Sequence, residues 1–279
     1  MVPDGDLRDA LTLERYLAPI TLSDELRLSV GVAADGHLPL VALPAEQIDT
    51  WFLDMGHDHP DMDDKTRAAY LIGNVAWSVA LNIGALHVAG PGVPAIDSAI
   101  VAMASEWYRY DHEGESGDAL RFMPRLLASP ADTFEPLDSA GIHALIVAVH
   151  APLIEHLFTR TRLGRNAMWR LVADAVTAGW LAVGKQIERD THAMALARAI
   201  MATPGSPLAN KQTHYVDITV PDAGDGLSGH EWFRARGGCC RYYTTEKSAG
   251  EYCSTCVLRA PESRDGLLRT YLRNKLTAA

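Results

Sequence analysis

Cysteine is absent from the first 238 residues of this 279-residue chain. The sequence also has no P-loop, no G-x-S-x-G, and no G-x-G-x-x-G ahead of a predicted helix. Two of these motifs cradle phosphate groups with glycine-rich backbone, and the third presents a serine nucleophile. Their absence argues against binding of a nicotinamide, a nucleotide or a flavin by those routes.

The sequence offers neither an export signal nor an uninterrupted membrane span. Its first six residues are acidic and lack an apolar core. The most apolar run, residues 75–96, contains Ser78, Asn82 and His87 and ends among Gly and Pro residues. Such a run favours a buried helix. We therefore expect a cytoplasmic protein with no membrane span.

Charge is distributed unevenly along the chain. The formal net charge is −10, which does not favour nucleic acid as a partner. From Glu231 onward, nine Lys and Arg stand against five acids, so this tail carries +4 and the first 230 residues carry −14. A solvated helix with ordinary loop charges accounts for this pattern. A basic end that attracts an anionic ferric complex or an acidic electron donor accounts for it equally.

All four cysteines fall in the last sixth of the chain, in the pattern C-C-x12-C-x2-C; they are Cys239, Cys240, Cys253 and Cys256. Four thiols gathered into one short segment favour a single four-thiolate metal site. Two disulfides would suit a small secreted domain better. A bridge between the adjacent pair is also sterically poor, because neighbouring Cα atoms lie about 3.8 Å apart, below the usual ~4.4–6.8 Å.

The spacing leaves the identity of the metal open. Structural zinc sites usually offer two C-x2-C knuckles, and only Cys253 and Cys256 form one here. Neighbouring side chains of a strand point to opposite faces, so the adjacent pair reaches one centre only if the backbone bends. Gly237 and Gly238 supply permissive backbone just before that pair. Thiolates suit both zinc and iron–sulfur clusters.

A family resemblance favours iron–sulfur. An adjacent cysteine pair followed by Arg241-Tyr242-Tyr243, and then a C-x2-C followed by Val257-Leu258, resembles the FhuF-like ferric-siderophore reductase family. The segment between the two cysteine pairs is longer here than in the best-known members. A weaker likeness extends over residues 150–169. The resemblance covers roughly the C-terminal half of the chain, and the N-terminal half only in overall layout.

The resemblance implies a [2Fe–2S] cluster on the four cysteines and transfer of one electron to siderophore-bound Fe(III), which releases Fe(II) in the cytoplasm. It implies a ferric siderophore of hydroxamate type as substrate and an external donor such as a ferredoxin or a flavoprotein reductase. The step needs no general acid or base, so no catalytic side chain is assigned. We expect four cations to meet an anionic ligand: Arg234, Arg236, Arg241 and Arg165.

Two other interpretations belong to different classes of protein. One is a non-catalytic protein with a structural zinc site, whose helical body binds a partner or serves siderophore assembly. The other is an iron–sulfur redox sensor. Colour separates the first from a reductase, and turnover with ferric chelates separates the second.

The pattern of apolar residues predicts a predominantly helical α+β fold. A helical body over residues 1–203, with short β hairpins, would be followed by a small cysteine-bearing iron–sulfur lobe over 204–279, after the Pro/Gly break at 204–207. We expect helices at 7–18, 44–52, 66–88, 137–160, 166–185, 187–202 and 264–276. We expect hairpins from 26–32 with 38–43 and from 99–110 with 119–123, and strands at 214–220 and 232–236.

Three further features admit a structural or a functional interpretation. The run His57-Asp58-His59, with several Asp nearby, reads as a polar loop in which Asp63 or Asp64 caps a helix, and a divalent-cation site is the other interpretation. His143 and His150 share a helix face. This placement favours core or interface residues, and a role as ligands is the other interpretation. Gly164 is expected to end the helix before it.

Overall fold

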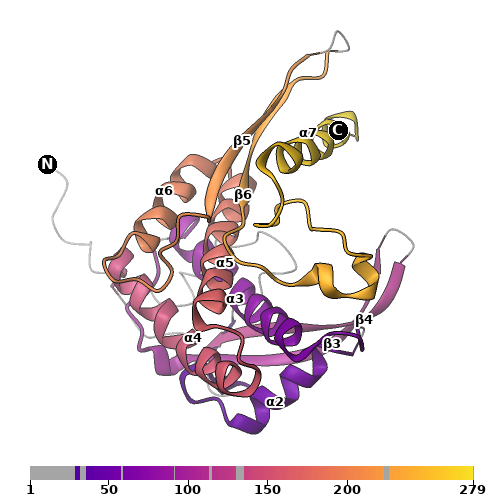
Figure 1. Cartoon of the computed structure of the whole chain (residues 1–279). Helices are drawn as coiled ribbons and strands as arrows, with labels where there is room; N and C mark the ends of the chain where they lie inside the picture. The colour runs from indigo at the N-terminus through magenta and orange to yellow at the C-terminus, as the bar shows by residue number, and fades with distance from the viewer. Residues whose placement is uncertain are drawn as a thin grey trace, which may run out of the picture.

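The computed structural model describes residues 29–31, 36–57, 59–90, 92–112, 115–129, 135–222 and 226–278 (Figure 1). Helix predominates among them, and the predicted mixed α+β class is confirmed. The helices are α2 (Ala45–Asp54), α3 (Asp64–Val88), α4 (Ser139–Thr161), α5 (Arg165–Gln186), α6 (Asp190–Met201) and α7 (Pro261–Ala278). The strands are β1 (Ser29–Val30), β2 (Leu38–Pro39), β3 (Val101–His112), β4 (Glu115–Leu126), β5 (His214–Val220) and β6 (Gly229–Ala235). The helix predicted over 7–18 lies outside the described residues.

The main core forms where α3 crosses α5. Both helices are apolar on most sides, and their buried residues include Val75, Val79, Val172 and Val176. A helix that is apolar nearly all round is stable only inside a protein. Packing of α4, α6 and the sheet around this pair completes the core.

Acidic caps begin two of the core helices, and the one at Asp63 was predicted. The side chain of Asp63 accepts a hydrogen bond from the Thr66 N–H and caps α3, and Asp138 does the same for α4 through the Gly141 N–H. The predicted cap at Gly164 is wrong. α4 ends instead at Arg162, which has a left-handed backbone with φ 59°, while Gly164 is the residue before α5. Arg162 therefore reverses the chain in place of glycine.

A long antiparallel hairpin, β3–β4, forms the centre of a four-stranded sheet in the order β1-β4-β3-β2. The hairpin predicted over 99–123 is confirmed and is longer than expected. The hairpin predicted from 26–32 and 38–43 is wrong in its pairing, because β1 lies parallel to β4 and β2 lies antiparallel to β3. Each of these short segments instead extends one edge of the long hairpin.

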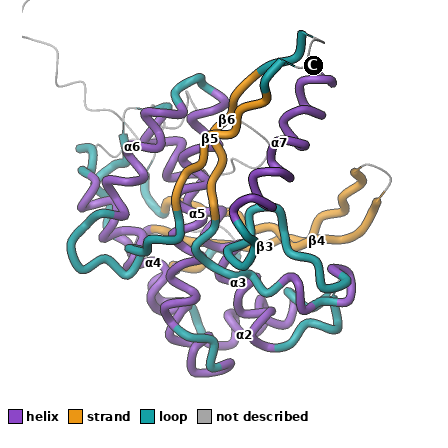
Figure 2. Tube along the Cα trace, turned by 45° about the horizontal axis from the view of Figure 1, so that its top comes forward, coloured by secondary structure: helices purple, strands orange, loops and turns teal. Residues whose placement is uncertain are grey.

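The second sheet is the two-stranded ribbon β5–β6, which leaves the helical body beside α7 (Figure 2). Tyr215 at its base belongs to the main core. Farther along, a small second core combines two residues of β5 with two of α7; its buried members are Ile218, Val220, Leu268 and Leu272. The ribbon thus links the helical body to the C-terminal helix, and the division at residues 203 and 204 stays a prediction.

Two of the core helices are long and apolar enough to cross a membrane by composition alone, namely α3 and α4. In the structure their apolar windows are 72% and 44% buried inside the protein. Core helices of globular proteins pass the same test, so the expectation that no segment spans a membrane stays a prediction.

Candidate functional site

The four cysteines lie on one long connection between β6 and α7, residues 236–260, which we call the cysteine loop. All four thiols are free, and Cys256 is buried. The four side chains line one small cavity together with residues of the same loop; the remaining lining residues are Arg241, Tyr242, Tyr243 and Tyr252. The structure therefore brings together the four residues that the sequence assigned to one centre.

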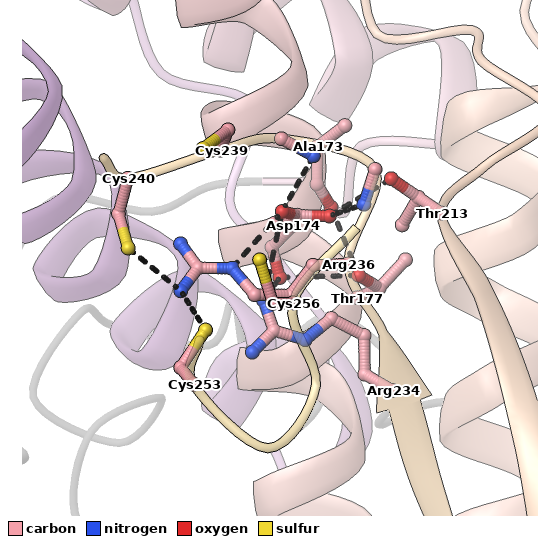
Figure 3. Close-up of polar contacts among 12 residues, drawn as sticks. Ala173, Asp174, Thr177, Thr213, Arg234, Arg236, Cys239, Cys240, Cys253 and Cys256 are labelled. Atoms are coloured by element: carbon pink, nitrogen blue, oxygen red, sulfur yellow. Dashed lines mark hydrogen bonds and ion pairs between the residues drawn. The ribbon is translucent and has the colours of Figure 1, made fainter. Parts of the chain in front are cut away.

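The cysteine loop is attached to α5 through the buried carboxylate of Asp174 (Figure 3). Oδ1 accepts hydrogen bonds from the Gly237 N–H and the Thr213 hydroxyl, each at 2.8 Å. Oδ2 accepts one from the Gly238 N–H at 2.9 Å. Two consecutive backbone donors thus face the two oxygens of one carboxylate, which fixes the direction of the chain just before Cys239.

Gly237 and Gly238 are required by close approach. Neither has a positive φ, so the conformational freedom that the sequence suggested is not what the site uses. A Cβ on Gly237 would lie 2.2 Å from Thr213 Oγ1, and one on Gly238 would lie 2.9 Å from the backbone N of Leu171. Any side chain here would separate the loop from α5.

Arg236 lies between Asp174 and two of the thiols (Figure 3). Its Nε is 3.5 Å from Asp174 Oδ2, and its Nη1 is 3.4 Å from Cys240 Sγ and 3.8 Å from Cys253 Sγ. Burial alone would lower the pKa of this guanidinium, but the neighbouring Cys240, Asp174 and Cys253 outweigh burial and raise it. Arg236 therefore carries a permanent positive charge beside the sulfur atoms.

The thiols differ in acidity. A hydrogen bond from Cys253 and the nearby charge of Arg236 together lower the pKa of Cys240 to about 5, against the effect of burial. The pKa of Cys253 is raised because it donates that bond and is itself partly buried. Burial also raises the pKa of Cys239. Of the two hydrogen-bonded thiols, Cys240 is thus the one that ionises first, and the thiolate is the form of cysteine that binds metals and acts as a nucleophile.

Backbone N–H groups point at the other two sulfur atoms. The Arg241 N–H donates to Cys239 Sγ at 3.4 Å, and the Leu258 N–H donates to Cys256 Sγ at 3.5 Å. The C-x2-C segment forms a tight turn, in which the Cys256 N–H donates to the Cys253 carbonyl at 3.0 Å. Donors of this kind stabilise negative charge on sulfur and tune the potential of sulfur-ligated centres.

A thiolate-bound metal or cluster fits these residues in kind. Four free thiols border one cavity, one has a lowered pKa, and hydrogen-bond donors face the sulfur atoms. Within the described part of the chain, no three His, Cys, Asp or Glu side chains lie close enough together to hold a metal ion. Ligation would therefore require the sulfur atoms to move closer than they lie here.

Arg241 joins the cysteine loop to the start of α3. It has a left-handed backbone with φ 61°, and its guanidinium contacts Asp63 Oδ2 at 2.6 Å and Thr66 Oγ1 at 3.1 Å. Asp61 accepts a second bond across this contact, from the Glu246 N–H at 2.6 Å. The acidic loop around His57 and His59 thus holds the cysteine loop by two of its carboxylates, Asp61 and Asp63.

The two remaining predicted cations have different surroundings. Arg234 lines a second cavity of about 330 Å³ next to the cysteines, which we call the α3–α5 groove. The groove is lined by Ala69, Tyr70, Gly73, Asn74, Trp77, Leu171, Asp174, Ala175, Ala178, Arg234, Arg236 and Cys240. Arg165 lies on the first turn of α5, where it pairs with Glu155 at 2.5 Å and stacks on Phe158. It lines neither cavity beside the cysteines.

Three functional residues were missed by the sequence analysis: Asp174, Asp63 as a partner of Arg241, and Trp77 in the groove. Asp174 did carry a signal. It is a single carboxylate among apolar neighbours, Leu171 to Val176, and a lone charge on a core helix needs a buried partner.

Comparison with known proteins returned no relative, because no protein-family model, no curated protein and no solved structure matches the chain.

Proposed function

We propose that this protein is a ferric-siderophore reductase that carries a [2Fe–2S] cluster on Cys239, Cys240, Cys253 and Cys256. The observation that supports the proposal most strongly is the gathering of all four thiols around one cavity, with Arg236 against two of the sulfur atoms. The resemblance of the cysteine motif to the FhuF-like family supplies the substrate class.

The chemistry is a one-electron reduction. Hydroxamate and other hard oxygen donors bind Fe(III) far more tightly than Fe(II), so the gain of one electron loosens the ion from its chelator. A cluster bound at the four cysteines would supply that electron, after receiving it from an external donor such as a ferredoxin or a flavoprotein reductase. Neither half of this exchange needs a general acid or base.

The contribution of the protein's own residues is electrostatic and positional. Arg236 and the two N–H donors offset negative charge on the sulfur atoms, which favours the more negative, reduced state. Asp174 holds the Gly-Gly segment and so fixes where the cysteine pair stands. The partners we propose are therefore a ferric siderophore and an electron donor in the cytoplasm.

The visible absorption spectrum of freshly purified protein, prepared without oxygen, tests this proposal. We expect a red-brown protein whose bands bleach on reduction and return, one equivalent for one, when a ferric hydroxamate is added. A colourless protein with stoichiometric zinc would establish the structural-zinc alternative instead. A coloured protein whose reduced bands persist in the presence of ferric chelates would match a redox sensor and would contradict the reductase.

A further inference from the structure

The α3–α5 groove combines cationic and anionic groups, and Cys240 is among its lining residues. Two guanidinium groups, Arg234 and Arg236, and one carboxylate, Asp174, line it. Asp174 already accepts three hydrogen bonds shorter than 3.0 Å from the loop and Thr213. Arg236 turns its Nη1 toward two sulfur atoms. Its charge is thus directed to the cysteines, which leaves Arg234 as the cation of the groove.

Arg234 is partly buried, with 21% of its side chain exposed, and it is poorly satisfied. Its Nη1 reaches the backbone carbonyl of Asp174 at 3.5 Å and the carboxylate at 3.8 Å, and both separations are long. Its buried Nε has no hydrogen-bond partner among the described residues. Burial lowers the pKa of this guanidinium, although Asp174 opposes the effect. A partly buried guanidinium in this state costs free energy unless a ligand supplies oxygen acceptors.

The groove also adjoins the proposed redox centre. Cys240 lines both the groove and the small cavity among the four thiols. The volume of about 330 Å³ is at the lower limit of small-molecule sites, so it accommodates one arm of a chelate, not a whole siderophore. The aromatic ring of Trp77 on α3 offers that arm an apolar wall.

We infer that the α3–α5 groove is the substrate site and that Arg234 selects iron chelates that bear a carboxylate. This inference deepens the proposed function and rests on it. A neutral trihydroxamate leaves Arg234 with only its long contacts to Asp174, and a chelate that ends in an ammonium group repels it. A carboxylate satisfies the guanidinium with charge-assisted hydrogen bonds, the stronger class of such bonds.

Gallium(III) complexes test the site without electron transfer, because Ga(III) occupies the same chelators and is not reduced. Two complexes share one trihydroxamate core. In the first the core ends in an amine, and in the second that amine is capped with succinate and ends in a carboxylate. Titration calorimetry of each into the protein as purified should show binding of the carboxylate form about tenfold tighter.

Arg234 and Arg198 line different cavities, so a Gln substitution at each provides a matched comparison. We expect Arg234→Gln to abolish the preference for the carboxylate form. Arg198→Gln should retain it, because Arg198 lines a separate cavity between α6 and β5 and stacks on Tyr215. Equal affinity of the unaltered protein for both complexes, or no binding of either, overturns the inference. Loss of the preference in Arg198→Gln alone also overturns it.

Gly73 provides a test that leaves the arginines in place. It lines the groove, and a Cβ added there meets no atom within 4 Å. Gly73→Leu should fill the groove and weaken binding of both complexes at least tenfold, whereas the single methyl group of Gly73→Ala should weaken it much less. Unimpaired binding to the Leu variant would place the ligand elsewhere. Because no step depends on reduction, failure here is distinct from failure of the reductase proposal.

Discussion

At residue scale, the carboxylate of Asp174 fixes the position of the cysteine loop, a role that regular secondary structure more often fills. It is buried on α5, receives two consecutive backbone N–H groups of the cysteine loop, and neutralises the cation that touches two thiols. The loop has only short 3₁₀ turns of its own, at Tyr242–Thr244 and Glu246–Ser248. Its position therefore depends on contacts with the helical body.

Asp174→Asn should loosen the cysteine loop. The amide keeps one oxygen, but its NH₂ group then faces an N–H donor, and Arg236 loses its counter-charge. We expect the free energy of unfolding to fall by about 3 kcal/mol, typical for one broken partner of a buried ion pair. Thiol titration of the metal-free protein should also show faster reaction of the cysteines than in the unaltered chain.

Thr213→Val is the matched control, because it removes only one of the three short hydrogen bonds to the same carboxylate. We expect a loss of about 1 kcal/mol and little change in thiol reactivity. Equal effects of the two substitutions would show that the contact with the Gly-Gly segment does not hold the loop.

The sequence was sufficient to identify the four cysteines and the nearby arginines, because these residues lie close together in the chain. It was insufficient for Asp174, which is 63 residues from Gly237. The sequence does not indicate which Asp contacts the Gly-Gly segment, because only the folded chain brings α5 against the loop. The same limit applies to the pairing of Arg241 with Asp63.

At the scale of elements, the crossing of α3 and α5 is the closest helix contact around the site. Two glycines permit it. A Cβ on Gly179 of α5 would lie 2.9 Å from the backbone carbon of Ala80, and one on Gly84 of α3 would lie 3.0 Å from the Trp180 ring. Both walls of the α3–α5 groove depend on this crossing.

Gly179→Ala should therefore destabilise the protein by about 1–3 kcal/mol, as overpacking does when a methyl group meets backbone that cannot retreat. Gly73→Ala is the control within the same helix pair, since its methyl group enters open space. An alanine there should stabilise α3 by up to about 1 kcal/mol. Urea denaturation of the two variants should shift in opposite directions, and a shared direction would contradict the packing argument.

Helices were predicted better than strand partners, for a physical reason. The period of apolar residues and the caps at Asp63 and Asp138 are local, so the sequence locates α3 and α4 within a few residues. The partner of a short strand depends instead on which long strand has a free edge in the folded protein, and this is not a local property of the sequence. β1 and β2 each found one on the β3–β4 hairpin.

At the scale of the whole molecule, one buried and one partly buried histidine make stability depend on pH. Burial lowers the pKa of His150 to about 4, and its Nδ1 donates to the Ile146 carbonyl at 2.7 Å. Burial and the nearby His192 lower the pKa of His87 to about 4, and His87 accepts a hydrogen bond from the Trp180 indole. Both rings are therefore neutral in the folded protein at neutral pH.

Stability should fall as the pH drops from about 6.5 toward 4. In this window the two histidines are protonated in the unfolded chain but stay neutral in the folded protein. Each histidine therefore lowers the free energy of unfolding by about 1.4 kcal/mol per pH unit. Above pH 6.5 their contribution is fully present. Denaturation measured at pH 7.5, 6 and 5 should show this slope, and His150→Gln should reduce it. An unchanged slope in that variant would exclude His150 as a source.

The order of the chain determines that the cysteine loop is synthesised after the helices to which it attaches. Synthesis proceeds from the N-terminus and domains fold as they emerge, so α3 and α5 are complete before residue 237 is made. Until then Asp174 is a carboxylate without its loop partners, and the groove stands open to solvent. The four thiols follow on the segment that covers this surface, and α7 is made after them. The proposed centre can therefore be completed only after both helices that hold its loop have been synthesised.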